Sequence, residues 1–568
     1  MKLPARVGVR FGAPLKEVTA QAARLAIQEL SVDALAERVR RTRTTLARAF
    51  LEQAKRLWSK TAVTDSTGRT LTYGRALTAT VLLGAGLSKA LPAAPRVAVL
   101  LPPSVGGALA NASLASIGRV PVNLNYTSSP EAVEHALKIS EIEAVVTSRA
   151  FLEALKSRGF VPPDRPFVFV EDLLGGVPRW KQALVYALLR LLPRRAVAAL
   201  FFGKASRSLD DEATVVFTSG STALPKGVVL THLNIQANVE MMFDAFPFTP
   251  ADSMLGVLPF FHSFGYTASL WLPLTRGLSA AYHMNPLEPG AVAKLAARTK
   301  PTILLGTPTF LQRYVAKIEP AAFASLKHVI SGAEKLRAAV ADAFQGRFGV
   351  RPLAAYGSTE LSPAATMTVP ARDPKQLLKD ESVGQILPGT AARVVDPETR
   401  KDLPFGEQGL LLIKGAHVMK GYLREPVKTA EVLRDGWYDT GDAAIIDRDG
   451  FVFIGGRLGS RFSKIGGEKV SHEVVEEKLQ KAAGLTEQAF VVSSVPDDSK
   501  GERLVVLYTR YDGDISALLD KAREQGLEPL WTPKPSSFHK VESFPLLGTG
   551  KLDLKALKQL ALTLETKP

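Results

Sequence analysis

The stretch 217-FTSGSTALPKGVVLTH-232 decides how the rest of the chain is interpreted. Its segment TSGSTALPKG brings hydroxyl groups, glycines and one lysine into ten residues. Backbone N–H groups, hydroxyl donors and a cation of this kind can converge on a phosphate. The segment does not match the Walker A pattern, because Lys226 precedes a glycine instead of following one. We therefore predict a phosphate-binding loop that does not belong to the P-loop hydrolases.

Size and composition limit the classes of protein that fit. The chain has 568 residues, of which 46% are hydrophobic, so we expect three or four structural units with their own cores. It contains no cysteine, which excludes disulfide bonds and thiolate metal sites. For the same reason the chain cannot carry a thioester itself, and any thiol in its chemistry must come from another molecule.

The chain is strongly basic, with a formal net charge of +16. Such a charge favours acidic partners, namely nucleic acid, anionic lipid or an acidic protein, and is equally compatible with simple solubility. The sequence has no combination of aromatic and basic residues typical of a nucleic-acid-binding module, so we predict no nucleic-acid partner.

Two long uncharged runs have the length of membrane spans. The run 97-VAVLLPPSVGGALANASLASIG-118 contains Pro-Pro, Gly-Gly and Asn, and predicts a buried strand, a turn and a helix of small residues. The run 253-SMLGVLPFFHSFGYTASLWLPLT-275 contains prolines and a histidine, and predicts a buried core segment. The start, MKLPARVGVRFGAPLKE, lacks the apolar stretch of a signal peptide. We expect no transmembrane helix.

The order of patterns predicts an α/β protein. Apolar residues at three- and four-residue spacing predict helices over 16–58, with arginines on the opposite face. From about 61 to 450, short β-rich runs alternate with helical stretches and glycine turns, which predicts layers of helices and mainly parallel sheets. The clearest strands are RVAVLL (96–101), EAVVTS (143–148), FVFVED (167–172) and ATVVFTS (213–219).

A domain boundary is expected where glycines cluster and charge rises, over 449–471. Beyond it the pattern predicts a helix at 472–482, strands near 488–493 and 503–509, and a helix at 515–525. We expect a helical extension at 1–57, a large layered body at 58–456, and a small α+β domain at 457–568.

One segment stands apart in composition. No acidic residue occurs from Leu173 to Leu209, and the basic residues there are Arg179, Lys181, Arg190, Arg194, Arg195, Lys204 and Arg207. A basic amphipathic segment over 179–207 can lie at the surface of an anionic bilayer. The alternative is a surface loop and helix that pack on the body.

Seven further motifs follow the opening stretch in a fixed order: 259-PFFHSFG-265, 331-SGAEKL-336, 356-YGSTE-360, 384-GQILPG-389, 438-YDTGD-442, 456-GRLGSRFSKIGGE-468 and 548-GTGKLD-553. In this order and spacing the set resembles the adenylate-forming superfamily of acyl-CoA synthetases, peptide-synthetase adenylation domains and luciferases. The resemblance covers about residues 60 to 555. It implies a large adenylation domain at 58–456 and a mobile C-terminal lid domain at 457–568.

A narrower resemblance rests on PFFHSFG, ISGAEKL, RFSKIGGEKVS, DDSKGE and FPLLGTGKLD. These segments look like the acyl-[acyl-carrier-protein] synthetase half of the bifunctional enzyme that reacylates 2-acylglycerophosphoethanolamine. The acyltransferase half has the motif His-x-x-x-x-Asp, which none of the eight histidines here begins. The start RVGVRFGAPL resembles the end of such an acyltransferase, so we expect a synthetase separated from its acyltransferase partner.

The resemblance implies a nucleotide site for ATP and Mg²⁺. The loop over the β- and γ-phosphates would consist of Thr218, Ser219, Gly220, Ser221, Thr222 and Lys226, with Ala223 where the family usually has glycine. Glu360 would coordinate Mg²⁺, assisted by Thr222. The remaining nucleotide-binding residues would be Gly332, Ala333, Glu334, Tyr356, Gly357, Thr359, Asp442 and Arg457. Asp442 would accept both ribose hydroxyls, which suits an ionised carboxylate.

Catalysis is expected to depend on Lys551, Thr222, Glu360 and His262. Lys551 of GTGKLD would span the carboxylate and the phosphate, and His262 would lie beside the acyl pocket. A buried histidine of purely structural purpose is the alternative for His262. A hinge at Gly459 or Ser460 would then rotate the small domain, and Gly466 and Gly467 would admit a phosphopantetheine arm.

The resemblance therefore implies activation of a fatty acid to acyl-AMP, followed by acyl transfer to an acidic holo acyl carrier protein for phospholipid reacylation. Electrostatic attraction to a basic enzyme suits such a carrier. A fatty acyl-CoA ligase is the alternative, and a membrane-recruited scaffold without activity is a third reading, disfavoured by the intact Lys226, Glu360, Asp442 and Lys551. We expect a cytoplasmic protein that contacts the inner face of the membrane through 179–207.

Overall fold

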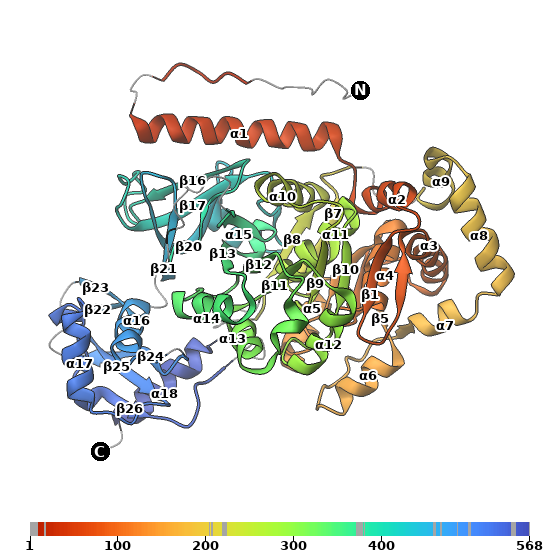
Figure 1. Ribbon diagram of the computed structural model, residues 1–568. Coiled ribbons are helices and arrows are strands. Elements are labelled where there is room, and N and C mark those ends of the chain that lie inside the picture. The colour runs from red at the N-terminus through yellow and green to blue at the C-terminus, as the bar shows by residue number, and fades with distance from the viewer. Residues whose placement is uncertain are drawn as a thin grey trace. The chain divides into compact units, whose positions relative to one another are not determined.

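The structure is a computed structural model that describes residues 10–15, 19–203, 205, 208–218, 224–370, 379, 381–457, 462–465, 468–485, 487–497, 501–546 and 552–566. It divides into two compact units (Figure 1). The first comprises Met1–Thr218, Pro225–Ala392 and Ile413–Tyr438. The second comprises Ser219–Leu224, Arg393–Leu412 and Asp439–Pro568.

The first unit begins with two helices, α1 (Ala20–Thr42) and α2 (Leu46–Arg56), which confirm the helical pattern read over 16–58. The Thr19 side chain accepts a hydrogen bond from the Ala22 amide at 3.1 Å and so caps the start of α1. The buried face of α1 carries Val32, Leu35 and Val39. The helices are separate because the chain is extended at Arg43 and Thr45.

The main sheet of the first unit has nine strands in the order β15-β14-β13-β12-β11-β9-β10-β1-β2. Its strands are β1 (Thr61–Asp65), β2 (Thr70–Thr72), β9 (Ser253–Gly256), β10 (Ser279–Tyr282), β11 (Ile303–Gly306), β12 (His328–Ser331), β13 (Pro352–Gly357), β14 (Ala364–Met367) and β15 (Gln385–Ile386). The strands from β13 to β1 pair in parallel, and both edges of the sheet are antiparallel.

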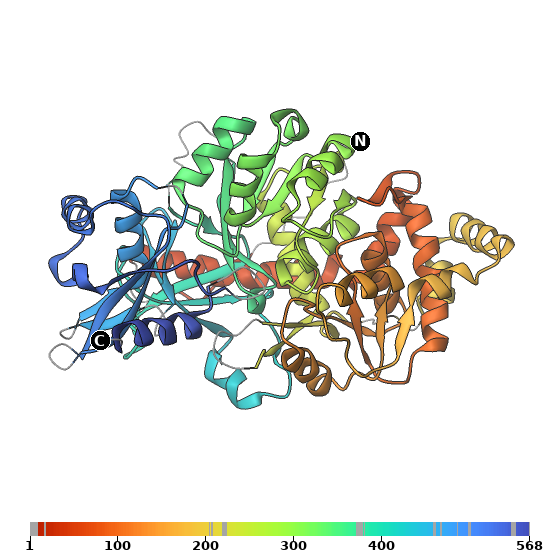
Figure 2. The ribbon, with the colours of Figure 1, turned by 90° about the horizontal axis from the view of Figure 1, so that it is seen from below.

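Helices α12 (Pro289–Thr299), α13 (Pro308–Lys317) and α14 (Ala338–Phe348) connect these parallel strands (Figure 2). Proline occupies the first turn of α12 and of α13, where a missing N–H costs nothing. Their apolar faces form one core, to which Leu295, Tyr314 and Phe344 contribute, together with Phe323 from the turn after α13. The core fixes the strands whose carboxyl ends carry the predicted motifs.

A second, all-parallel sheet has the order β4-β3-β5-β6. It comprises β3 (Arg96–Leu100), β4 (Val120–Asn123), β5 (Val145–Thr147) and β6 (Phe167–Phe169), with helices α3 (Tyr73–Ala90), α4 (Val105–Ser116), α5 (Pro130–Ile139) and α6 (Arg149–Lys156). The strands predicted at 96–101 and 143–148 are confirmed. The run 97–118 is a strand, a turn and the small-residue helix α4, as predicted.

The strand predicted at 167–172 is wrong in its second half. β6 ends at Phe169, and the short helix α7 (Val170–Gly175) begins at the next residue. Glu171 and Asp172 lie in the first turn of α7, where carboxylates interact favourably with the helix dipole. Glu171 and Asp172, which follow the apolar run, therefore mark the start of a helix and not the polar end of a strand. Helices α8 (Arg179–Leu191) and α9 (Arg194–Phe201) follow.

The opening motif lies at a β-hairpin. β7 (Glu212–Phe217) pairs antiparallel with β8 (Gly227–Thr231), and β18 (Gly421–Tyr422) pairs with β8. The strand predicted at 213–219 is thus confirmed, although its sheet is antiparallel. Helix α10 (His232–Ala245) follows β8 through a capping box of Thr231 and Asn234.

The run 253–275 is buried, as predicted. It contains β9, the π-helix η1 (Phe264–Trp271) and α11 (Leu272–Arg276), and Tyr266, Leu270 and Trp271 are fully enclosed. A Cβ atom at Gly265 would lie 2.0 Å from the Pro259 carbonyl oxygen, so only glycine fits this close approach. None of the described helices is long and apolar enough to cross a membrane.

A five-stranded sheet has the order β16-β17-β20-β19, with β21 paired to β20. Its strands are β16 (Thr390–Val395), β17 (Gly409–Gly415), β19 (Leu433–Arg434), β20 (Trp437–Ile446) and β21 (Val452–Arg457), and α15 (Pro426–Val432) precedes β19.

The C-terminal part of the second unit is an α+β fold, as predicted. It comprises β22 (Phe462–Ile465), β23 (Glu468–Ser471), α16 (His472–Ala482), β24 (Phe490–Asp497), β25 (Gly501–Tyr508), α17 (Ile515–Glu524), β26 (Phe538–Lys540) and α18 (Leu554–Thr566). The predicted helices at 472–482 and 515–525 correspond to α16 and α17, and the two predicted strands overlap β24 and β25. Two clusters of buried apolar side chains hold it together.

A buried ion cluster anchors α1 to the body of the first unit. Glu240 on α10 is 6% exposed and accepts two hydrogen bonds from Arg43, at 2.8 and 3.0 Å. Arg276 donates to the same carboxylate at 2.9 Å. Burial alone would raise the pKa of Glu240, but Arg43, Arg276 and Arg38 outweigh it and lower the pKa.

Replacing Glu240 by glutamine is expected to lower the free energy of unfolding of the first unit by about 3 kcal/mol, because it leaves Arg43 and Arg276 without their shared counter-charge. Urea denaturation measures the loss. Glu37→Gln is the matched control, because Glu37 of α1 forms exposed ion pairs with Arg10 and Arg41 that solvent screens, and its loss should lower the free energy of unfolding far less. Equal losses in the two variants would contradict the anchoring role.

Acid is expected to destabilise the first unit through His232. Burial lowers the pKa of His232 to about 4, and its Nδ1 accepts a hydrogen bond from the Leu46 amide at 3.3 Å. Between pH 6.5 and 4 the unfolded chain binds a proton that the folded chain does not, so stability is full above pH 6.5 and falls as the pH falls. The full difference is about 3 kcal/mol. His232→Asn should flatten the pH dependence of urea unfolding between pH 7 and 5, and an unchanged slope would refute this.

Candidate functional site

Two of the predicted motifs, SGAEKL and YGSTE, lie side by side at the carboxyl edge of the main sheet. Parallel strands β12 and β13 are neighbours, with Val329 opposite Pro352 and Ser331 opposite Ala354. Gly332–Glu334 follow the end of β12, and Ser358–Glu360 follow the end of β13. Because ligands of open α/β sheets bind at the carboxyl ends of the strands, this edge is the candidate site.

A tight turn shapes the YGSTE motif. A Cβ atom at Gly357 would lie 1.8 Å from the Pro363 carbonyl oxygen, so the backbone passes where no other residue fits. Thr359, Glu360 and Leu361 then form one turn of 3₁₀-helix, η3. Tyr356, which precedes Gly357 on β13, is half-buried. The turn directs Glu360 inward.

Glu360 is a buried carboxylate, 7% exposed, with no cation bonded to it among the described residues. Its Oε1 accepts a hydrogen bond from the Tyr422 hydroxyl at 2.9 Å, and its backbone carbonyl accepts one from the Met419 amide at 2.8 Å. Since an isolated buried carboxylate is unfavourable unless a positive group balances it, this environment suits a cationic ligand.

The phosphate-loop motif reaches the same tyrosine. The Thr218 amide donates to the Lys226 carbonyl at 3.0 Å and closes the base of the hairpin loop. The Lys226 ammonium lies 4.7 Å from the centre of the Tyr422 ring, within range of a cation–π contact. Tyr422 thus contacts both Lys226 and Glu360, which are far apart in sequence, and joins two motifs that were predicted to share one nucleotide.

Tyr422 was missed by the sequence analysis. It belongs to a strand of two residues, too short to show any periodicity, and its contacts come from pairing of β18 with β8. Tyr438 lies in the same region, where burial and then the Glu360 carboxylate raise its pKa well above the usual value. Two tyrosines therefore surround Glu360 with neutral hydroxyl groups.

The PFFHSFG motif lies in the loop between β9 and η1. His262 is partly exposed, and its ring packs against Phe261 at 4.8 Å between ring centres. Phe261 contacts the Tyr126 ring edge-on at 4.8 Å. The Ser263 hydroxyl lies 3.5 Å from the Thr359 hydroxyl. His262 therefore adjoins an aromatic cluster beside the YGSTE turn, next to the candidate phosphate region.

The SGAEKL turn has one residue with an additional structural role. The Glu334 carboxylate accepts hydrogen bonds from the Thr309 hydroxyl at 2.7 Å and the Thr309 amide at 3.3 Å. It therefore stabilises the start of α13, as carboxylates at helix N-termini do. Ala333 has a φ of +69°, a left-handed conformation that turns the chain sharply after Gly332.

In the second unit, Asp442 and Arg457 are cross-strand neighbours on β20 and β21. The Asp442 amide donates to the Thr440 hydroxyl at 3.0 Å, and Gly441 has a φ of +70°. The structure thus places side by side the two residues predicted to bind the ribose. The Arg457 side chain and Ser219, Gly220, Ser221, Thr222, Gly459, Ser460, Gly466, Gly467 and Lys551 lie outside the described residues.

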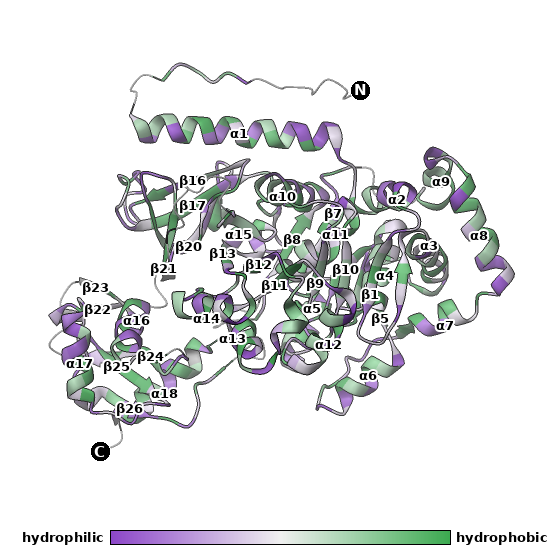
Figure 3. Ribbon diagram, viewed as in Figure 1, coloured by the Kyte–Doolittle hydropathy of each residue, from purple (hydrophilic) through white to green (hydrophobic). Residues whose placement is uncertain are grey.

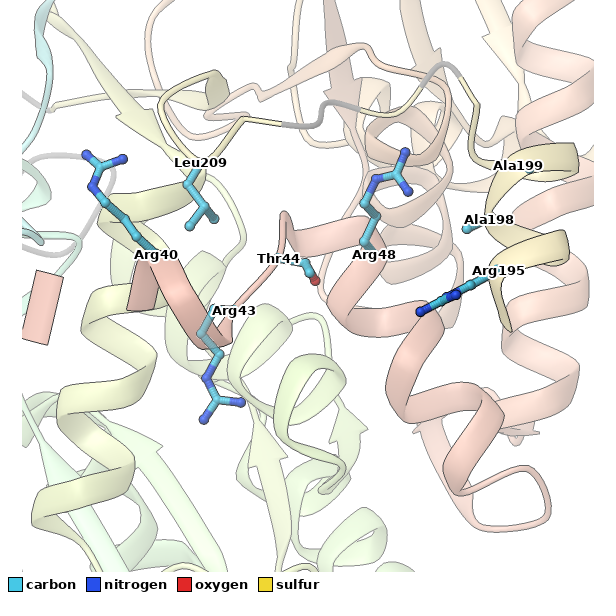
Figure 4. A pocket seen from close by; sticks show the side chains of 8 residues that line it. All are labelled: Arg40, Arg43, Thr44, Arg48, Arg195, Ala198, Ala199 and Leu209. Carbon is cyan, nitrogen blue, oxygen red and sulfur yellow. The ribbon is translucent and has the colours of Figure 1, made fainter. Parts of the chain in front are cut away.

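A cavity of about 660 Å³ lies elsewhere in the first unit, between α1, α2 and α9 (Figure 4). Four arginines line it, and Figure 4 shows their guanidinium groups spread apart. Arg40 is bonded to Asp210 at 2.8 Å, Arg43 to Glu240, and Arg48 to the Phe202 carbonyl at 3.1 Å. Three of the four arginines thus already have acceptors, and none of the predicted nucleotide-binding residues lines the cavity.

Among the described residues, no group of three or more His, Asp or Glu side chains could hold a metal ion. A single carboxylate is nevertheless what Mg²⁺ requires when it is bound together with substrate phosphates. The buried Glu360 carboxylate, with the Tyr422 hydroxyl bonded to it, fits an oxygen-liganded cation of this kind.

The AMP-binding enzyme family matches residues 50–423. A long-chain-fatty-acid–CoA ligase of Bacillus subtilis (strain 168) is 29% identical over 539 residues, covering 89% of this chain and 93% of its own length. A feruloyl-CoA synthase of an Amycolatopsis species is 31% identical over 351 residues, which are 61% of this chain and 69% of its own.

The crystal structure of ATP-bound MatB from Rhodopseudomonas palustris is 25% identical, with a TM-score of 0.75, and covers 90% of this chain and 98% of that one. This similarity confirms the predicted fold class, a large α/β body with a smaller C-terminal domain. Since the family match spans well over half of the sequence, the chain belongs to the AMP-binding enzyme family, the adenylate-forming superfamily that its eight motifs resemble.

Proposed function

We propose that this ATP-dependent adenylate-forming enzyme activates a fatty acid to acyl-AMP and then passes the acyl group to a thiol. In the first step a carboxylate oxygen bonds to the α-phosphorus of ATP while the bond to the β-phosphate breaks and pyrophosphate leaves. The observation that supports the proposal is the contact of Tyr422 with both Lys226 and Glu360, because a cation and a buried carboxylate from two predicted nucleotide-binding motifs lie against one side chain.

The protein's part in this step is to hold two anions together and to neutralise charge as it moves toward the leaving group. Lys226, with Thr218 and the loop residues Ser219–Thr222, would hold the β- and γ-phosphates. Glu360 would hold Mg²⁺, with Thr222 as its companion. A Mg²⁺ ion held there would supply positive charge to offset the negative charge that develops on the leaving pyrophosphate.

The base and sugar of the nucleotide would lie along the turns already described. Tyr356 and Gly357 would contact the adenine together with the Gly332–Glu334 turn, and Thr359 would bind the α-phosphate. Asp442 would accept the two ribose hydroxyls and Arg457 would reach the same region. The cross-strand pairing of Asp442 with Arg457 supports this shared role.

A fatty acid is the proposed substrate because the Bacillus subtilis relative, which aligns with 89% of the chain, is named a long-chain-fatty-acid–CoA ligase. The aromatic and apolar surroundings of His262 support an apolar acyl group beside the phosphate region. His262 would then lie next to the reacting carboxylate. The second relative is named for an aromatic acid, so ferulic acid is the natural competitor to test.

Coenzyme A is the proposed acceptor, since both relatives are named for CoA thioesters. A holo acyl carrier protein, which would serve phospholipid reacylation with an acyltransferase partner, is the second candidate. The net charge of +16 supports it, because an acidic carrier would be attracted to the enzyme. The chain has no cysteine, so in either case the thiol belongs to the acceptor.

The test is incubation of the protein with ATP, Mg²⁺ and a panel of medium- and long-chain fatty acids, with pyrophosphate release as the first readout. Mass measurement of CoA and of holo acyl carrier protein, supplied separately, identifies the acceptor. We expect pyrophosphate release with fatty acids and an acyl-CoA product. Pyrophosphate release with ferulic acid but with no fatty acid would contradict the proposed substrate. Acylation of the carrier protein but not of CoA would show that the carrier protein is the acceptor. If no acid led to pyrophosphate release, the result would support a scaffold without activity.

A further inference from the structure

Helix α8 exposes a continuous apolar stripe to solvent. Trp180, Leu184, Leu188 and Leu191 are 67%, 49%, 36% and 81% exposed, respectively. At 100° per residue these positions fall within about 80° of one another around the helix axis. The opposite face carries Val185 and Leu189, which are buried. Helix α8 therefore has apolar side chains on two faces, and those of only one face are buried by the protein. Figure 3 shows hydrophobic and hydrophilic residues following one another along α8.

The body of the first unit holds α8 firmly with this stripe outward. α8 packs on α3 at an edge of the unit, as Figures 1 and 2 show. The Lys55 ammonium donates to the carbonyls of Leu189 and Leu192 at 2.7 and 2.8 Å, at the C-terminal end of the helix. The Trp58 indole donates to the Tyr186 hydroxyl at 2.7 Å. Because these contacts fix the rotation of the helix, the exposed stripe is a permanent feature of the surface.

An exposed cation, Lys181, lies beside the stripe, about 20° beyond Leu188 around the helix axis. Arg179 and Arg190 are also exposed and lie about 100° and 80° from the other edge of the stripe, and the Arg190 guanidinium is 5.6 Å from the centre of the Trp58 ring. In the part of the chain that the structure describes, Arg179 and Lys181 form no ion pair. Leu200 of α9 adds a further apolar side chain, 67% exposed, and no acidic residue interrupts 173–209.

We propose that the outer face of α8, continued by Leu200 of α9, docks onto an anionic phospholipid bilayer. Leucines and a tryptophan bordered by Lys and Arg are the composition of helices that lie in the plane of a membrane interface. The apolar stripe enters the boundary between headgroups and acyl chains, and the flanking cations contact anionic headgroups. At 13 residues α8 is too short to span a bilayer and lies along its surface.

Charge favours a bilayer over a protein partner. The centres of protein–protein interfaces are depleted in lysine, whereas here Lys181 lies directly beside the stripe, and neither Lys181 nor the nearby Arg179 forms an ion pair among the described residues. An anionic surface supplies that counter-charge along the whole helix without requiring a particular arrangement of partner side chains. The docking is a property of the surface and does not depend on which acid the enzyme activates.

The experiment measures co-sedimentation of the full chain with vesicles of phosphatidylcholine alone and of phosphatidylcholine with phosphatidylglycerol. We expect binding to the anionic vesicles that is lowered about tenfold or more in Trp180→Ser/Leu184→Ser/Leu191→Ser. The matched control Ile27→Ser/Val161→Ser/Val427→Ser removes three other exposed apolar side chains and should bind like the original protein. Equal binding of the two triple variants would overturn the proposal.

Charge and insertion are tested separately. Arg179→Gln/Lys181→Gln should weaken binding to anionic vesicles about tenfold or more at low salt, with a smaller loss at high salt. Brominated lipids should quench the fluorescence of the original protein and quench Trp180→Phe much less, because Trp180 is the tryptophan in the stripe. Absence of quenching would overturn the proposal. It would also be overturned if the original protein did not bind vesicles and instead formed a dimer in solution that the Trp180→Ser/Leu184→Ser/Leu191→Ser variant did not form. Unchanged circular dichroism of each variant establishes that it is folded.

Discussion

Lys551→Ala is expected to lower acyl-adenylate formation about 10³-fold or more, while acyl transfer from preformed acyl-adenylate to the thiol is retained. The reason is electrostatic: the resemblance assigns this lysine to the gap between the fatty carboxylate and the α-phosphate, where it offsets repulsion between two anions. In the second half-reaction pyrophosphate has already left, so the same charge is no longer required.

The two half-reactions are measured separately, by fatty-acid-dependent ATP–pyrophosphate exchange and by thioester formation from synthetic acyl-adenylate. Lys558→Ala is the matched control, because it removes an exposed lysine of α18 a short distance along the chain. It should leave both rates near those of the original protein. Equal losses in the two half-reactions of Lys551→Ala would remove this lysine from the adenylation step.

Glu360→Gln is expected to lower ATP–pyrophosphate exchange by about 10²- to 10³-fold and to raise the Mg²⁺ concentration that the reaction requires. The amide keeps the size of the side chain and can still accept the hydrogen bond of the Tyr422 hydroxyl, but it removes the negative charge that holds the cation. The loss corresponds to about 3–4 kcal/mol of transition-state stabilisation.

Two variants make the assignment specific. Glu431→Gln removes an exposed carboxylate of α15 and should change neither the exchange rate nor the Mg²⁺ requirement. Tyr422→Phe removes the hydroxyl that orients Glu360, but the charge of Glu360 and the aromatic ring against Lys226 remain. We therefore expect the exchange rate to fall about tenfold or less. An unaltered Mg²⁺ dependence in Glu360→Gln would show that this carboxylate has another role.

Much of the fold followed from local patterns. The strands at 96–101 and 143–148 and helices α16 and α17 lie where apolar runs and periodicities placed them, because each buries one continuous face. The position of Gly332 and Glu360 at neighbouring strand ends follows from the same alternation of strands and helices. The motif order led to the correct family because a phosphate loop, a carboxyl-edge turn and a lysine loop recur together in it.

Features that depend on contacts between residues distant in sequence could not be predicted from the sequence. Tyr422 reaches Lys226 and Glu360 only because β18 pairs with β8, and a two-residue strand has no pattern of its own. The ion cluster around Glu240 likewise collects charges from α10, α11 and the end of α1, each of which resembles an ordinary surface residue in its own segment. The short helix α7 was hidden because its apolar start continued the run of β6.

The long helix α1 is bonded to the first unit near its middle and at its C-terminal end. The Gln28 amide oxygen accepts from the Ala392 amide at 3.2 Å, the Ser31 hydroxyl accepts from the Gly389 amide at 3.0 Å, and Arg43 reaches Glu240 at the C-terminal end. Val32, Leu35 and Val39 cover apolar surface between these points. A protein that starts at Leu46 would therefore expose this apolar surface to solvent, and we expect it to aggregate. Engineered forms of this enzyme should keep α1.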